Sequence, residues 1–246
     1  MGKIDIRYCF TLNQDHREII DLRIDDSTLE NVNQPAADLP GWANLDFCQC
    51  CHCPLDPAIH PYCPVATSLV GVASRFEEIV SYDEVRVTIT TKERKVGHRT
   101  TAQRAISSLL GLIFATSGCP HTQFFKPMAC FHLPLATERD TIFRVAGMYL
   151  LGQYFRRTEG KSEDLEFSGL SKIYDNVHEV NMGVADRLRS ALNSDSSVNA
   201  IISLDMFTKA LPFVIEDKLL DLRYIFNSYF SDEFEEILES LPSDVK

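Results

Sequence analysis

The chain has 246 residues, 45% of them hydrophobic, which is enough to bury a core and excludes a disordered protein. The formal net charge of −11 argues against a protein that coats nucleic acid or anionic membranes. The strongest apolar run, residues 105–116, is too short to span a bilayer, and the amino terminus lacks an apolar signal region. We therefore expect a cytoplasmic protein whose partners are proteins or small molecules.

Two segments near the amino terminus alternate apolar and polar residues. Residues 4–12 have this period of two, and apolar residues return at 19–24, which together predict an antiparallel hairpin. After the cysteine-rich stretch, apolar residues from Val65 to Val80 have helical spacing, and residues 85–89 alternate as a strand. The first half therefore reads as mixed α and β structure.

The next segments read mainly as helices. Thr100 followed by Gln103 resembles a capping box ahead of an apolar helix that Gly118 ends. A proline-rich loop follows, and a helix from Thr137 carries one apolar face. The residues of that face are Ile142, Val145, Tyr149, Leu150 and Tyr154.

The helix predicted at residues 170–191 carries a heptad seam with Asn181 at one core position. This seam can pack within the chain or form a homodimer between two copies, centred on Val177 and Val184. A further helix follows, which Pro212 is expected to end or kink. The last helical region is acidic, with a net charge of −6 over residues 216–246.

Together these elements predict an α+β fold in two parts. Residues 1–135 are expected to form antiparallel strands and helices around a cysteine-rich metal-binding loop. Residues 136–246 are expected to form a C-terminal helical bundle.

Five of the eight cysteines lie between residues 48 and 63, and this density indicates a metal site. Two overlapping Cys-x2-Cys pairs exist, Cys48 with Cys51 and Cys50 with Cys53, and one metal can use only one of them. We favour Cys50 and Cys53, because Cys53 is followed by proline, as are Cys63 and Cys119.

The predicted ligands are therefore Cys50, Cys53, Cys63 and Cys119, with His132 the next candidate for the fourth position. Zinc bound by thiolates is the favoured cofactor, and an iron-sulfur cluster is the alternative. A third interpretation is that these cysteines are small buried side chains. A closed site with four cysteines would be structural, because it leaves no position for a reacting water.

Catalytic signatures are weak elsewhere. The sequence has no His-Glu-x-x-His pattern and no Gly-x-Ser-x-Gly elbow, so the enzyme interpretation loses support. The segment from Arg86 to Arg104 contains six basic residues and a single acidic one, Glu93, and it ends at the start of a predicted helix. Such a segment is either an anion- or nucleotide-binding module or a solvated strand end and turn.

Several short motifs resemble an uncharacterised family of bacterial proteins, classed as a domain of unknown function. They are Trp42-x2-Leu45-x-Phe47, Gln49-Cys50-x2-Cys53-Pro-Leu55, Cys63-Pro-Val-Ala66, Ser117-Gly-Cys119-Pro120, Lys126-Pro-Met128 and Phe131-His-Leu-Pro134. The similarity extends to Leu204-Asp205 and so covers nearly the whole chain. It implies the same four cysteines and no known activity, and Cys48 and Cys51 look like additions of this sequence.

The favoured function is a zinc-stabilised cytosolic scaffold or regulator that binds a partner protein through its helical half. The alternatives are a metal-dependent enzyme or iron-sulfur redox sensor that uses the cysteines, and the anion-binding module.

Overall fold

A computed structural model describes residues 2–12, 16–34, 38–76, 79–191 and 196–240. The strands in this part of the chain are β1 (Lys3–Thr11), β2 (Arg17–Asp25), β3 (Glu84–Thr90) and β4 (Lys95–Thr101). The α-helices are α1 (Pro64–Ala73), α2 (Ala102–Thr116), α3 (Lys126–Cys130), α4 (Glu138–Thr158), α5 (Ser168–Ala191), α6 (Ser196–Leu220) and α7 (Asp232–Ser240). The 3-10 helices are η1 (Gly41–Ala43), η2 (Ser74–Phe76), η3 (Gln123–Phe125) and η4 (Arg223–Phe230).

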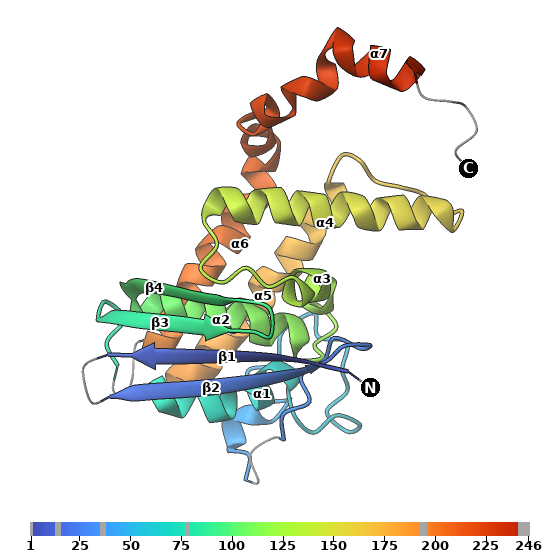
Figure 1. The fold of residues 1–246 in the computed structure, drawn as a ribbon. Helices are drawn as coiled ribbons and strands as arrows, with labels where there is room; N and C mark the ends of the chain where they lie inside the picture. Colours follow the sequence, from blue (N-terminus) through green and yellow to red (C-terminus); the bar gives the residue numbers. More distant parts are fainter. Residues whose placement is uncertain (1, 13–15, 35–37, 77–78, 192–195, 241–246) are drawn as a thin grey trace.

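The strands form one antiparallel sheet in the order β2-β1-β3-β4 (Figure 1). The predicted hairpin and the strand at 85–89 are confirmed as β1, β2 and β3. Tyr8 of β1 lies opposite Ile20 of β2 and Ile89 of β3, and all three are buried. The alternation in the sequence therefore marks the face that packs on the helices.

The sequence did not predict strand β4, nor the short helix α3 within the expected proline-rich loop. Strand β4 pairs with β3 so that Arg99 lies opposite Arg86, and none of its residues is fully buried. An edge strand of this kind carries no apolar alternation, and its basic residues discourage pairing with another sheet.

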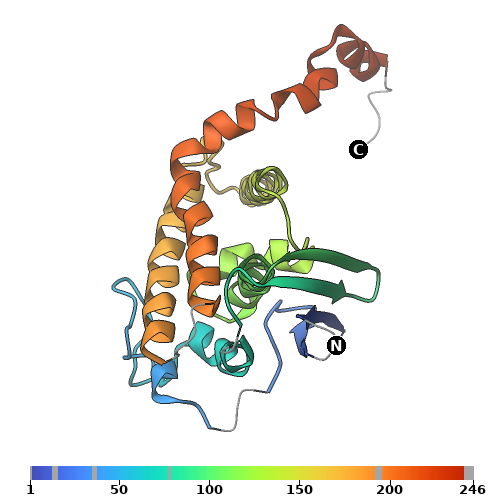
Figure 2. The same ribbon diagram turned by 90° about the vertical axis from the view of Figure 1, so that its left-hand side faces the viewer.

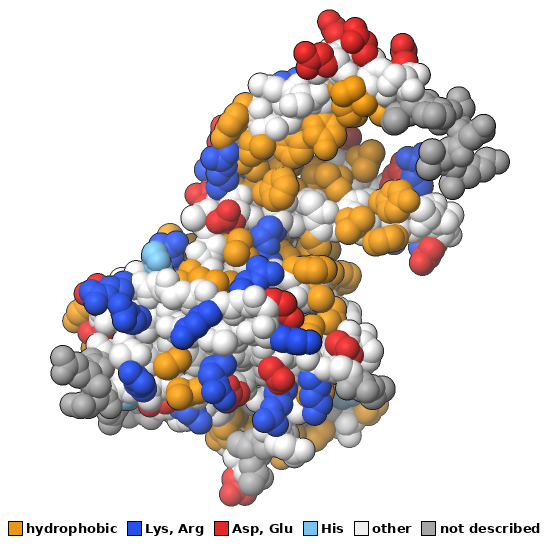
Figure 3. Space-filling model, viewed as in Figure 1, with side chains coloured by type: hydrophobic (Ala, Val, Ile, Leu, Met, Phe, Trp, Pro, Cys, Tyr) orange, Lys and Arg blue, Asp and Glu red, His pale blue; other side chains and the backbone are white. Residues whose placement is uncertain are grey.

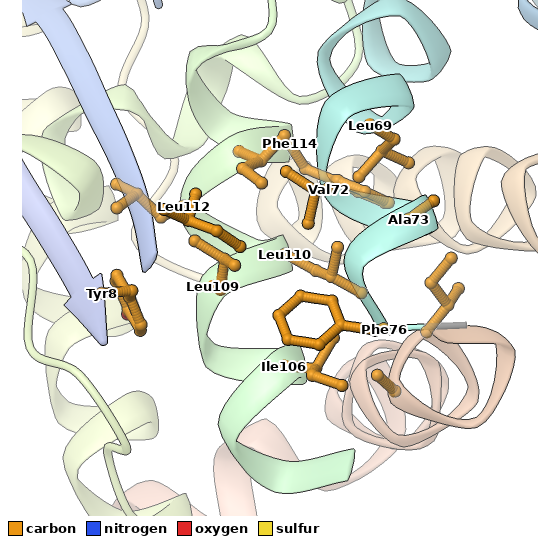
Figure 4. Close-up of a cluster of buried hydrophobic side chains, with 14 of the residues drawn as sticks. Tyr8, Leu69, Val72, Ala73, Phe76, Ile106, Leu109, Leu110, Leu112 and Phe114 are labelled. Atoms are coloured by element: carbon orange, nitrogen blue, oxygen red, sulfur yellow. The ribbon is translucent and has the colours of Figure 1, made fainter. Parts of the chain in front are cut away.

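Helices α1 and α2 cover the inner face of the sheet. Figure 4 shows α2 between β1 and α1, with Leu109 on the side of Tyr8 and Phe76 on the other side. The predicted helix from Val65 to Val80 is too long, because α1 ends at Ala73 and the short η2 follows. The predicted cap of α2 is displaced by one residue, since the Thr101 side chain accepts from the Arg104 N–H.

The outer face of the sheet is polar. Figure 3 shows Lys and Arg side chains spread among acidic ones over this face. Arg7 and Asp21 form an exposed ion pair across β1 and β2 at 2.6 Å. Such a pair adds little stability, so the face is held mainly by the core on its other side.

Helices α5 and α6 lie side by side (Figure 2). The seam predicted on α5 is buried in a single chain, from Leu170 to Leu188. Asn181 within it donates to Asp205 at 3.0 Å and to Thr208 at 3.3 Å, both on α6. A homodimer through α5 would therefore have to use the faces of this helix that point away from α6.

Two buried clusters hold the helices. The larger cluster joins the sheet and α2 to Val184 and Ala185 of α5 and Ile201 of α6. The smaller cluster joins α4 to the first half of α5 and the second half of α6. The division into residues 1–135 and 136–246 stays a prediction, and the larger cluster draws residues from both parts.

Helix α4 begins where expected, because the side chains and backbone of Thr137 and Asp140 form a capping box. Ile142, Val145 and Tyr149 are buried as predicted, but Leu150 and Tyr154 on the same predicted face are exposed. α6 continues through position 212, so the proline there does not end the helix. Within the described ranges, no helix combines the length and apolar character needed to cross a membrane.

The end of the chain extends away from the sheet. α6 leads outwards, and η4 and α7 lie at its far end (Figures 1 and 2). No residue of η4 or α7 is buried. The acidic helical region expected at the end of the chain consists of the end of α6, η4 and α7, and residues 241–246 lie outside the described part.

Candidate metal centre

The cysteine-rich loop is closed at its base by backbone hydrogen bonds. The Leu45 N–H donates to the Pro61 carbonyl at 2.9 Å, and the Cys63 N–H donates to the Ala43 carbonyl at 2.9 Å. Between these pairs the chain turns tightly, with the Cys53 N–H bonded to the Cys50 carbonyl at 3.0 Å. This turn places Cys50 and Cys53 at the two ends of one small loop, the usual form of a zinc knuckle.

One face of α5 forms a wall for this loop. A Cβ atom at Gly183 would lie 3.1 Å from the Cys50 sulfur, so only glycine leaves this sulfur its present position without a shift. One turn earlier on α5, Glu179 accepts a hydrogen bond from Cys51 at 3.5 Å, and two turns earlier the Asn176 carbonyl accepts one from His52 Nε2 at 3.0 Å. The loop is therefore docked on a helix from the other end of the sequence.

Arg187 anchors the start of the loop. Its guanidinium donates to the carbonyls of Trp42, Asn44 and Leu45 at 2.8, 2.6 and 3.0 Å. The side chain is among the most buried in the protein, at 1% exposure. Within the described residues its partners are carbonyls and it forms no ion pair, so a buried positive charge stands beside the cysteines.

The remaining two predicted ligands come from neighbouring elements. Cys63 is the N-cap of α1 and precedes Pro64, the first residue of that helix. Cys119 is buried and follows Gly118, whose φ of +85° is readily adopted by glycine. The loop after α2 thereby contacts the cysteine-rich loop, where His121 donates to the His52 carbonyl.

The four predicted cysteines act on one another electrostatically. Burial raises the pKa of the Cys50 thiol to about 12, and Cys63, Cys53 and Cys119 add to this effect, while Arg187 opposes it. Burial also raises the pKa of the Cys119 thiol. The backbone N–H groups of His121 and Thr122 favour the thiolate and partly offset this rise. These effects indicate that the thiols lie in one region of the structure.

The gathered thiols do not form a closed ligand set as they stand. In the described ranges, His, Cys, Asp and Glu side chains form no group of three or more that could hold a metal ion. Cys48 and Cys51 are exposed, whereas Cys50 and Cys53 are partly buried. The choice of Cys50 and Cys53 over the other pair stays a prediction, as do zinc and the iron-sulfur alternative.

Two histidines beside the cysteines were missed by the sequence argument. The rings of His52 and His121 stack with centroids 4.0 Å apart, and His121 Nε2 donates to the His52 carbonyl at 3.1 Å. Burial lowers the pKa of His121. His52 Nδ1 is buried, with no hydrogen-bond partner among the described residues. Their positions next to Cys51, Cys53 and Cys119 were the available signal, whereas no sequence pattern indicated Arg187.

The six basic residues predicted as an anion site are spread along β3, the β3–β4 turn, β4 and the start of α2. Arg86 and Arg99 face each other on the exposed side, and Arg104 lies in the first turn of α2. Binding of an anion here stays a prediction.

His132, the other candidate for the fourth ligand, forms a hydrogen bond with Tyr8 of β1. Its Nε2 atom lies 2.6 Å from the Tyr8 hydroxyl, which in turn lies 3.2 Å from Ser108 Oγ. Burial, assisted by Arg144, lowers the pKa of His132 from 6.5 to about 4. We infer that the Tyr8 hydroxyl donates to a neutral imidazole that carries its proton on Nδ1.

This histidine makes the protein less stable in acid. The pKa of His132 is lower in the folded state than in the unfolded chain, so as the pH falls below 6.5 the unfolded chain binds a proton before the folded protein does. The free energy of unfolding therefore decreases as the pH falls from 6.5 to about 4, the pKa in the folded state. Between pH 7 and pH 5 this loss is about 2 kcal/mol. His132→Gln should remove it in urea unfolding at both pH values, whereas His98→Gln on the exposed β4 should keep it. Equal acid sensitivity of the native protein and His132→Gln would refute this assignment.

Comparison with known proteins identifies a family but no activity. A family model described as a domain of unknown function (DUF6901) matches residues 6–227. No curated protein and no solved structure has a significant match to the chain. The match confirms the resemblance drawn from the short motifs.

Proposed function

The chain belongs to the family described as a domain of unknown function (DUF6901), and we propose that it is a zinc-stabilised cytosolic scaffold that binds a partner protein through its helical half. The observation that carries this proposal is an exposed apolar surface on the helices. We call it the α4–η4 surface. Its members are Phe143, Leu150, Leu151, Tyr154 and Phe155 of α4 and Tyr224, Ile225, Phe226, Tyr229 and Phe230 of η4.

The two halves of this surface touch. The Phe143 and Phe226 rings stack with centroids 6.3 Å apart. The Arg139 guanidinium lies 5.3 Å from the centre of the Tyr224 ring and donates to its hydroxyl. Figure 3 shows hydrophobic side chains gathered over these helices. Monomeric proteins rarely expose contiguous apolar patches of this kind without a binding role.

The charges beside the surface indicate the chemistry of the partner. α7 carries Asp232, Glu233 and Glu235 in its first turn and no basic residue in its last. Ile237 and Leu238 on the same helix are exposed. Aromatic side chains are frequent anchors at interfaces, and acidic rims select basic partners. A partner protein with an apolar groove and a basic rim fits this surface best.

The buried positive charge of Arg187 beside the cysteines supports the zinc part of the proposal. A tetrahedral zinc site with four thiolates carries a net charge of −2, which the buried Arg187 would partly neutralise. The amide groups next to Cys119 and the unpartnered His52 Nδ1 would support or supplement the ligands. Side-chain rotation would have to bring the sulfurs to about 2.3 Å from the ion.

A redox sensor is a second candidate. Cys48 and Cys51 expose thiols beside the predicted site, and Cys48 has a φ of +45°, which is unfavourable for a residue with a side chain. Reactive cysteines are accessible ones, so this pair would be the first to be oxidised.

Photo-crosslinking in the producing cells tests the partner. A photoreactive phenylalanine analogue in place of Tyr229 is expected to give one discrete adduct with another protein, whereas the same analogue in place of the exposed Tyr82 gives none. The purified partner should then bind the chain, and Phe230→Glu should weaken binding by about thirtyfold, the cost of a buried anchor.

Each alternative outcome is informative. An adduct only with a second copy, together with a dimer in sedimentation, would replace the partner protein by self-association. No adduct at position 229, or the same adducts at positions 229 and 82, would overturn the proposal.

A further inference from the structure

A cavity of about 420 Å³ lies between α2, α3, α4, α5 and α6, and no cysteine is among its lining residues. This volume is within the range of about 300–1,000 Å³ that is usual for small-molecule pockets. Its wall is largely apolar. Its apolar lining residues include Leu112, Phe125, Met128, Val177, Leu204 and Phe207.

Arg144 is the charged residue of this cavity's wall that is half-buried, whereas Arg104 and Glu138 are exposed. Its Nη2 atom donates to the carbonyls of Met128 and Phe131 at 3.0 and 2.9 Å. The nearest acid along its helix, Asp140, is engaged in the capping box with Thr137. Among the described residues Arg144 forms no ion pair, although it lies half-buried in the cavity wall.

Several other polar groups of the wall have partners or lie at its exposed side. Glu138 pairs with Lys218 at 3.0 Å, and Arg104 is exposed at the start of α2. Ser108 accepts from the Leu135 N–H at 3.0 Å and contacts Tyr8, which binds His132. These bonds leave the guanidinium of Arg144 as the group that most lacks an acidic partner.

We propose that this cavity binds a small organic carboxylate with an apolar body, such as a medium-chain fatty acid, with its carboxylate on Arg144. The remaining guanidinium N–H groups can form charge-assisted hydrogen bonds to the carboxylate. The apolar body would replace cavity space against α2, α5 and α6. An uncharged ligand of the same shape would leave Arg144 unpaired and bind more weakly.

Gly111 of α2 gives a way to fill the cavity. A Cβ atom at this position would meet only Leu204, at 3.8 Å, so an alanine fits without a shift. A phenylalanine would extend further into the cavity, which Gly111 lines. Gly111→Ala is therefore the matched control for Gly111→Phe.

The test uses a dansyl-labelled undecanoic acid as the fluorescent probe with the full chain. Decanoic acid is expected to displace the probe at least about ten times better than decanol, a factor typical of one lost charged contact. Arg144→Gln should remove this preference, and Arg144→Lys should restore part of it. Gly111→Phe should abolish probe binding, while Gly111→Ala keeps it. Thermal unfolding without probe checks that each variant is folded.

Three results would overturn the proposal. They are equal displacement by acid and alcohol, an unchanged preference in Arg144→Gln, and full probe binding by folded Gly111→Phe. Tyr229→Ser checks the α4–η4 surface, because loss of probe binding in that variant would place the probe there instead. If Gly111→Phe does not fold, the acid-over-alcohol preference of the two Arg144 variants still tests the proposal. None of these results depends on the binding of a partner protein.

Discussion

Replacing Arg187 with methionine is expected to lower the free energy of unfolding by about 3–5 kcal/mol, because three hydrogen bonds from a charged donor are lost, each worth about 1.5–3 kcal/mol and not fully additive. The guanidinium donates to three carbonyls of residues 42–45, and each would lose this charged donor, most severely at the buried Leu45. Methionine keeps the apolar stem, so the loss reports mainly the charged head. Urea unfolding at neutral pH measures this change.

Arg189 provides the matched control. It lies two residues further along α5 and forms an exposed ion pair with Asp186 at 2.7 Å. Arg189→Met should cost at most about 1 kcal/mol, as exposed pairs do. If the two variants lose the same stability, Arg187 is not the anchor described above. In zinc-loaded protein, Arg187→Met should also release the metal about 10–100 times more readily to a chelator, as expected for a group that supports the ligands.

Metal removal is expected to have the second large effect. Protein purified without chelators and without air should contain about one zinc per chain and no colour, as a four-thiolate site would. A chelator should then unfold the sheet and its loops, because structural zinc contributes up to about 10–16 kcal/mol in small zinc domains. Cys53→Ser should reproduce this loss. Metal analysis, a visible spectrum and circular dichroism measure these results.

Cysteines outside the predicted set serve as controls. Cys9 lies on β1 and Cys130 at the end of α3, and serine at either position should leave the metal content unchanged. Serine at the exposed Cys48 and Cys51 should also retain the metal. Iron with a brown absorbance would favour the redox sensor, and the absence of any metal would mean that Cys50, Cys53, Cys63 and Cys119 serve as packing residues.

Much of the fold follows from local patterns. The alternation around Tyr8 predicts β1 and its inner face, and the Thr137 signal predicts the start of α4. The heptad spacing around Asn181 predicts the buried side of α5. Strand β4 cannot be predicted from such a pattern, because an exposed edge strand needs no apolar periodicity. Leu150 and Tyr154 share the apolar spacing of α4 yet are exposed, since spacing alone does not say how far a neighbouring helix extends.

The sequence alone determined the composition of the candidate site, a cysteine loop with prolines after Cys53, Cys63 and Cys119. The tertiary structure decided what surrounds it. Arg187 meets the carbonyl of Asn44 across 143 residues of sequence, and Gly183 leaves room for Cys50 on a distant helix. The burial of a charge and the close approach of a sulfur to a backbone depend on how α5 docks on the loop. Local sequence patterns hold no information about that docking, because they report only which face of a helix is apolar.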